Sequence, residues 1–191
     1  MMEKTQFRLP LGQGWSVSFQ RFPHPPGGRV EQPPASLGVL PVGRTALGAW
    51  LLPLADDECC WIGMADNAAL PPAMLAVRAE LGDAALRDAI AGGPWDAERA
   101  SELALPGALW LAGMREAGNA PLWHVFSNSR LAPATQRCLS LVFRLRTLGT
   151  HGASFTTRLE LVNYARFFGE TGIRPPAPMD AAAAYQGWRL P

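Results

Sequence analysis

The alternation of apolar and polar residues is the first pattern in the chain. Over residues 15–22, Trp15, Val17 and Phe19 alternate with small or polar residues, the two-residue period of a half-buried strand. Further apolar runs, separated by polar or glycine-containing turns, cover residues 37–42, 44–54 and 59–64. The first third of the chain therefore predicts a meander of antiparallel strands.

The central part of the chain has a different spacing. Two prolines at 71–72 suit the first turn of a helix, where a missing N–H costs little. Apolar residues then recur at three- and four-residue intervals at Met74, Val77 and Leu81. Asp83 can cap a second helix, which the two glycines at 92–93 would end. We therefore expect a central helical segment over about residues 71–104.

Strands return in the second half. Short apolar runs at 108–114 and 122–127 flank a natural hairpin connection. The clearest hairpin joins residues 137–148 to residues 154–162, where apolar and polar residues alternate on both strands. A short helix at 164–168 precedes the end of the chain.

The chain ends in a proline-rich link and an alanine-rich helix through Tyr185. Together the patterns predict an α+β fold: a mainly antiparallel sheet built from hairpins, a central helical segment and short C-terminal helices. A length of 191 residues with 48% apolar residues fits a single α+β domain over residues 1–191. We expect residues 23–34 to form a surface loop, because they contain five prolines and two glycines. Residues 172–191 form a C-terminal extension.

Composition narrows the possible partners. The net charge is only +1, so the chain lacks the basic field that nucleic-acid binding requires. No run approaches the roughly 20 apolar residues of a membrane helix. Lys4 is the only lysine in a chain rich in Ala, Gly, Pro and Arg, which is typical of GC-rich bacterial coding. The first residues show no apolar signal region, so we expect a cytoplasmic protein.

The cysteines agree with a reducing compartment. There are three, an odd number without a regular framework, which predicts free thiols. Cys59 and Cys60 are adjacent in a strand-like run, so their side chains point to opposite faces and at most one faces the core.

One catalytic arrangement can be written from the sequence. A thiol nucleophile needs a base and a group that orients the base. Cys60 could be the nucleophile, or Cys59 in its place, with His124 as the base and Asn128 or Asp66 as the orienting group. An activated cysteine is favoured at a helix N-terminus, however, and Cys60 lies in a strand pattern. Phosphate-binding, dinucleotide-binding, nucleophile-elbow and metal-ligand motifs are missing from the sequence.

The remaining candidates are binding residues. Trp123 and Arg130 flank a polar stretch that could bind a small polar ligand, or could simply form a turn. Trp95 and Trp188 lie beside Gly or Pro, which makes them the better interface candidates among seven tryptophans. We expect a non-enzymatic protein-interaction domain, such as an adaptor, chaperone, immunity-type partner or homo-oligomer component. Its partner would be another protein or a second copy of the chain, with no cofactor, metal, nucleic acid or membrane. The alternatives are a small cysteine hydrolase or a small-ligand-binding module.

Overall fold

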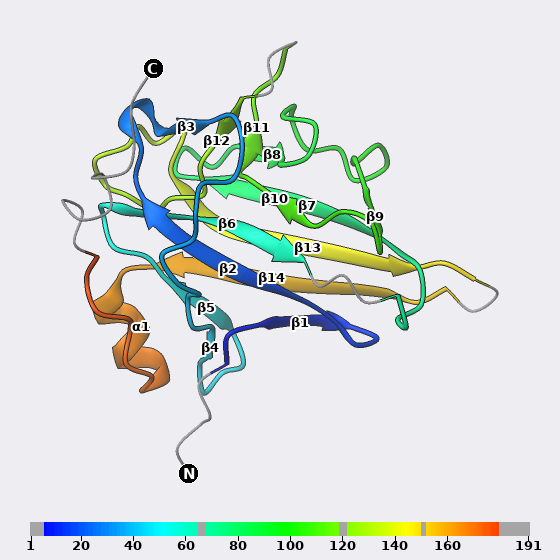
Figure 1. Cartoon of the computed structure of the whole chain (residues 1–191), viewed down its shortest axis with the longest axis horizontal. Coiled ribbons are helices and arrows are strands. Elements are labelled where there is room, and N and C mark those ends of the chain that lie inside the picture. Colours follow the sequence, from blue (N-terminus) through cyan, green and yellow to red (C-terminus); the bar gives the residue numbers. More distant parts are fainter. Residues whose placement is uncertain (1–5, 65–67, 119–121, 150–151, 180–191) are drawn as a thin grey trace.

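The computed structural model describes residues 6–64, 68–118, 122–149 and 152–179. Two sheets pack face to face, and a smaller third sheet lies at one end (Figure 1). The first sheet has the order β1 (Leu9–Gly12), β2 (Trp15–Pro23), β6 (Glu58–Met64), β10 (Trp110–Leu111). The second has the order β4 (Gly43–Arg44), β5 (Trp50–Pro53), β14 (Ser154–Val162), β13 (Cys138–Thr147), β7 (Ala73–Leu81), β8 (Leu86–Asp88). A further strand, β9 (Leu103–Leu105), also pairs with β7.

The third sheet is short. It consists of β11 (Met114–Arg115), β12 (Trp123–His124) and β3 (Arg29–Val30) in that order. Described strand pairs in all three sheets are antiparallel, apart from the parallel pair of β5 and β14. The expectation of a mainly antiparallel fold is therefore confirmed.

Apolar residues from both large sheets form the main core. Phe19 of β2 meets Phe143 of β13 edge to face, with the ring centroids 6.3 Å apart. The hairpin expected from alternation is β13 with β14, in which Leu141 pairs with Leu159 and both side chains are fully buried. The alternation of apolar and polar residues therefore predicted correctly which face of this hairpin points into the core.

The expected central helical segment over residues 71–104 is wrong. Its first part is β7, which lies between β13 on one edge and β8 and β9 on the other. The residues that β7 buries toward the core are Ala73, Leu75, Val77, Ala79 and Leu81. Ala76 points to the opposite face and is buried as well. An apolar residue on the outer face interrupts the alternation of apolar and polar residues by which a strand is recognised in a sequence. Hydrogen-bonded pairing of β7 with strands on both of its edges therefore determines its conformation, although the spacing of its apolar residues also fits a helix.

One α-helix, α1 (Tyr164–Thr171), follows β14 in the described part of the chain. Asn163 Oδ1 caps it by accepting a hydrogen bond from the backbone N–H of Arg166, and Gly172 ends it with a left-handed conformation. Phe167 packs on Leu51 and Val162, so α1 covers part of the second sheet. The helix expected through Tyr185 and most of the extension at 172–191 lie outside the described residues.

The segment at 23–34 holds more structure than a surface loop. It contains one 3-10 turn, η1 (Pro26–Gly28), followed directly by β3. No described helix is long and apolar enough to cross a membrane.

Candidate functional site

A cleft of about 800 Å³ lies where the third sheet meets the end of the first sheet. Three segments that are distant in sequence line it: residues 23–28, the turn at 56–57, and residues from the 129–136 segment. The side chains along it are mainly apolar, with prolines at 23, 25, 26 and 133. We take this cleft as the candidate functional site.

Backbone conformation and hydrogen bonds fix the first wall of the cleft. Gly27 and Gly28 both have positive φ, at 74° and 66°, which lets the chain reverse immediately before β3. The backbone N–H of His24 donates to the carbonyl of Asp57 at 2.8 Å, and the N–H of Val125 donates to the carbonyl of Gly28 at 3.0 Å. The wall at 23–28 is therefore tied both to the turn and to the third sheet.

Asp56 and Arg130 join the turn to the third lining segment. The backbone N–H of Arg130 donates to Asp56 Oδ1 at 3.0 Å, and its guanidinium Nη2 donates to Oδ2 at 3.0 Å. The backbone hydrogen bond and the guanidinium both lower the pKa of the Asp56 carboxyl. The pair is largely exposed, so it contributes little to the free energy of unfolding. Its main effect is to hold Asp56 and the backbone of Arg130 in fixed positions.

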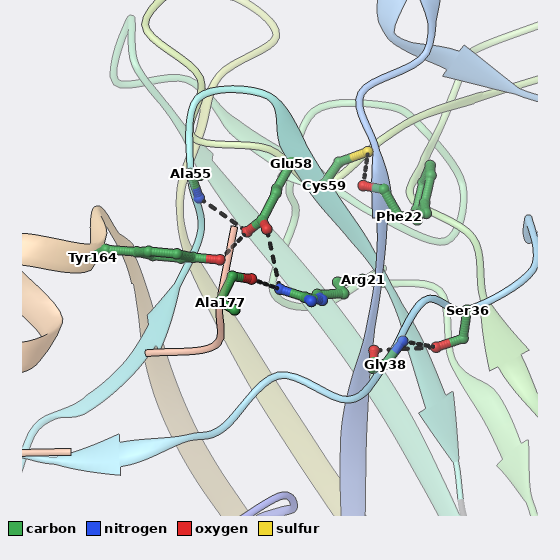
Figure 2. A network of polar contacts seen from close by, with 9 residues as sticks. All are labelled: Arg21, Phe22, Ser36, Gly38, Ala55, Glu58, Cys59, Tyr164 and Ala177. Carbon is green, nitrogen blue, oxygen red and sulfur yellow. Dashed lines mark hydrogen bonds and ion pairs between the residues drawn. The ribbon is translucent and has the colours of Figure 1, made fainter. Parts of the chain in front are cut away.

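A network of hydrogen bonds centred on Glu58, the residue directly after the turn, holds the turn in place (Figure 2). Glu58 is fully buried, and its Oε1 accepts a hydrogen bond from Arg21 Nη1 at 3.3 Å. Its Oε2 accepts from Tyr164 Oη at 2.6 Å and from the backbone N–H of Ala55 at 3.2 Å. Because a buried charge is costly unless it is paired and hydrogen-bonded, these three donors keep the turn in one conformation.

The same network reaches α1 and the chain beyond it. Arg21 Nη1 also donates to the carbonyl of Ala177 at 2.9 Å. Burial, followed by the hydrogen bond to Glu58, raises the pKa of the Tyr164 phenol. The phenol therefore stays protonated and remains a donor to Glu58 at neutral pH.

Two buried serines connect the turn to the third lining segment. Ser127 Oγ donates to the carbonyl of Glu58 at 3.3 Å and accepts from the backbone N–H of Ser129 at 3.1 Å. Ser129 Oγ in turn accepts from the backbone N–H of Leu131 at 3.2 Å. The walls of the cleft are thus held by a connected series of hydrogen bonds, which is the arrangement of a preorganised binding site.

The chemistry of the cleft suits binding. Leu131 is 87% exposed and lines the cleft, where it adds apolar surface. The exposed carboxylate of Asp57 forms no ion pair with any described residue, whereas Asp56 is neutralised by Arg130. Burial lowers the pKa of His24, against the effect of the Pro25 carbonyl, so the imidazole is uncharged at pH 7. The cleft therefore presents apolar surface and one unpaired negative charge.

The residues of the thiol arrangement do not come together. Cys60 is fully buried in the core, and burial, with the charges of Cys138 and Glu58, raises the pKa of its thiol well above the ordinary value. Asn128 Nδ2 donates to the carbonyl of Leu161 at 2.6 Å. His124 Nε2 lies 3.9 Å from Glu116 Oε2. Asp66, the other orienting group considered, lies outside the described residues.

The four predicted binding residues are also dispersed. Arg130 does not itself line the cleft, but its guanidinium donates to Asp56, which does. Trp123 packs edge to face on Trp110, with the guanidinium of Arg115 5.9 Å from its ring. Trp95 lies within 6 Å of two guanidinium groups, those of Arg78 at 5.9 Å and Arg144 at 5.6 Å. Trp188 lies outside the described residues. Of the three described side chains, only that of Arg130 is bonded to a residue that lines the cleft.

Sequence reasoning missed His24, Asp57 and Leu131 as site residues. The available signal was the proline-rich segment at 23–34, which is longer than most structural connections. Nothing in the sequence indicated which segments it would face.

Comparison with protein-family models, curated proteins and solved structures finds no match for the chain.

Proposed function

We propose that the protein is a non-enzymatic interaction domain that binds a segment of a partner protein in the cleft. The observation that carries this proposal is the pairing of an apolar, open cleft with walls that buried hydrogen bonds already hold in place. A preformed site loses little conformational entropy when a partner binds.

The lining indicates the chemistry of the partner segment. Proline rings and the exposed Leu131 provide surface for an apolar side chain. Asp57 provides an unpaired carboxylate at the same cleft, which favours a lysine or arginine nearby in the partner. The expected ligand is therefore a short segment that combines an apolar residue with a basic residue.

The hydrolase alternative lacks supporting geometry. A thiolate nucleophile requires an accessible cysteine with a lowered pKa, and all three cysteines are buried with raised pKa values. In the binding alternative the role of Arg130 becomes indirect, because its guanidinium holds Asp56, which lines the proposed cleft.

Selection from a random peptide display library tests the proposal. We expect enriched peptides to carry an apolar and a basic residue and to bind the purified chain in a direct assay. Leu131→Glu and Asp57→Lys should each weaken that binding at least about tenfold, which corresponds to roughly 1.4 kcal/mol.

Matched substitutions elsewhere serve as controls. Leu47 is 98% exposed and Glu98 is exposed without a side-chain partner in the described structure, so Leu47→Glu and Glu98→Lys should leave peptide binding unchanged. Equal binding by the cleft variants and the controls would refute the proposed site. A concentration-dependent dimer that Leu131→Glu dissociates would instead identify a second copy of the chain as the occupant.

A further inference from the structure

A second and smaller cavity, of about 300 Å³, lies beside the third sheet. Its charged and polar side chains come from Arg87, Arg115, Glu116, His124 and Thr135. Thr135 lies between Pro133 and Gln136, which line the larger cleft, so the two cavities share a chain segment. The proposed function does not use this smaller cavity.

Strand pairing positions the imidazole of this cavity. In the third sheet His124 of β12 pairs with Met114 of β11 on one side and with Arg29 of β3 on the other. Two glycines allow neighbouring backbone to approach closely. A Cβ atom at Gly113 would collide with the carbonyl of His124, and one at Gly92 would collide with the carbonyl of Arg115. Neighbouring backbone segments therefore lie in close contact at Gly113 and at Gly92, where a larger residue would not fit.

Positive charge exceeds negative charge around the cavity. Arg29 Nη2 lies 3.2 Å from Glu116 Oε1, which neutralises that carboxylate. Arg87 is half-buried, and neither it nor Arg115 forms an ion pair with any described residue. The guanidinium of Arg115 lies 5.9 Å from the centre of the Trp123 ring. Three arginines and one glutamate give a local charge of +2, because the imidazole is neutral at pH 7.

Two polar atoms of the cluster lack hydrogen bonds. Glu116 Oε2 and His124 Nδ1 are buried and have no hydrogen-bond partner among the described residues. Leaving a buried polar group unpaired costs about 1–3 kcal/mol, so a ligand that supplies the missing hydrogen bond recovers part of that cost. His124 Nδ1 can donate to an anion when it carries the ring proton, and His124 lines the same cavity as the unpaired Arg87. Glu116 Oε2 can only accept a hydrogen bond, so it does not contribute to anion binding.

We propose that this cavity binds a small anion, a carboxylate or a phosphate, through the guanidinium of Arg87. Arginine presents a planar set of donors that matches the oxygens of both anions, and a half-buried guanidinium is less screened by water than an exposed one. The cavity volume is at the lower end of the range for small-molecule sites, which limits the ligand to a few non-hydrogen atoms. Glu116 is paired with Arg29, so the net charge around the cavity remains positive.

Titration of the ¹⁵N-labelled full chain tests this site with two probes, inorganic phosphate and succinate, at constant ionic strength. We expect saturable shifts of the backbone amides of Arg87, Glu116 and His124 with at least one probe. The probe that binds more tightly distinguishes a phosphate site from a carboxylate site. Arg87→Gln should weaken that binding at least tenfold.

Arg99→Gln is the matched control, because Arg99 is exposed and its side chain has no partner among the described residues. It removes the same charge elsewhere and should leave the titration unchanged. The proposal is wrong if Arg87→Gln binds both probes as the natural chain does. It is equally wrong if neither probe shifts these amides in a saturable way while the spectrum remains that of a folded protein.

Discussion

Tyr164 Oη donates a 2.6 Å hydrogen bond to Glu58 Oε2, and this contact joins the first turn of α1 to the turn that lines the cleft (Figure 2). Glu58 is fully buried, so each of its donors offsets part of the cost of taking a carboxylate out of water. The stability of the chain and the shape of the proposed binding site therefore depend on the same contact.

Tyr164→Phe should lower the free energy of unfolding by about 1–3 kcal/mol, because Glu58 loses a donor that water cannot easily replace. Urea denaturation measures the change. Phe168→Leu is the control: Phe168 lies on the same helix but is 54% exposed, so its replacement should cost much less. Equal effects of the two substitutions would mean that the hydrogen bond contributes nothing specific.

The pKa of Tyr164 also predicts a response to alkali. Because burial and Glu58 raise this pKa above that of the unfolded chain, the corresponding stability is fully present below about pH 10. It is lost as the pH rises from there toward the folded-state pKa. Absorbance titration of the folded chain should show one tyrosine that ionises later than a free phenol, and Tyr164→Phe should remove that late phase. Its persistence in the variant would assign it to Tyr185.

The three thiols should be free and protected. Native protein should react slowly with a thiol reagent, whereas the denatured and unreduced chain should yield three thiols. Burial is the main cause of the raised pKa values of all three, so little thiolate exists at pH 8. A thiol that reacts rapidly in the native protein would reopen the hydrolase alternative, and a count of one would reveal a disulfide.

His24 and His124 should both titrate below the ordinary histidine value of about 6.5. Burial is the main cause for each; at His124 the charges of Arg29 and Arg87 act in the same direction and Glu116 opposes them. A depressed folded-state pKa contributes stability above pH 6.5 that is lost as the pH falls through the folded-state value. NMR titration of the ring protons measures both pKa values. His124→Gln should reduce the loss of stability between pH 7 and 5. An unchanged loss would show that protonation of His124 does not cause it.

The sequence predicted those parts of the fold in which each strand has one buried face and one exposed face. β13 and β14 alternate cleanly, so their pairing and inward side could be predicted. β7 could not, because Ala76 is buried on the outer face and the alternation is lost. Cys59 shows the same limit: it points away from Cys60, as adjacent strand residues must, yet it is buried because Phe22 and Val125 cover it.

The candidate site was less predictable than the fold. Pro25, Asp57 and Leu131 come from segments whose proximity is set by long-range pairing of β3 with β12 and of β2 with β6. A local pattern contains no information about such pairings. Sequence reasoning reached Arg130 from its polar surroundings, but the acceptor that gives it a role, Asp56, belongs to a distant turn.

Neighbouring residues of the same chain segments contribute to the two cavities. Gly28 lines the cleft and the next residue, Arg29, holds Glu116 of the smaller cavity, while Thr135 and Gln136 face one cavity each. If both proposed ligands bind, each acts on chain segments that the other contacts. If the anion changes the affinity for the partner by some factor, the partner must change the affinity for the anion by the same factor. Two pairs of adjacent residues, Gly28–Arg29 where η1 meets β3 and Thr135–Gln136 in a turn, would transmit any such coupling between the two ligands.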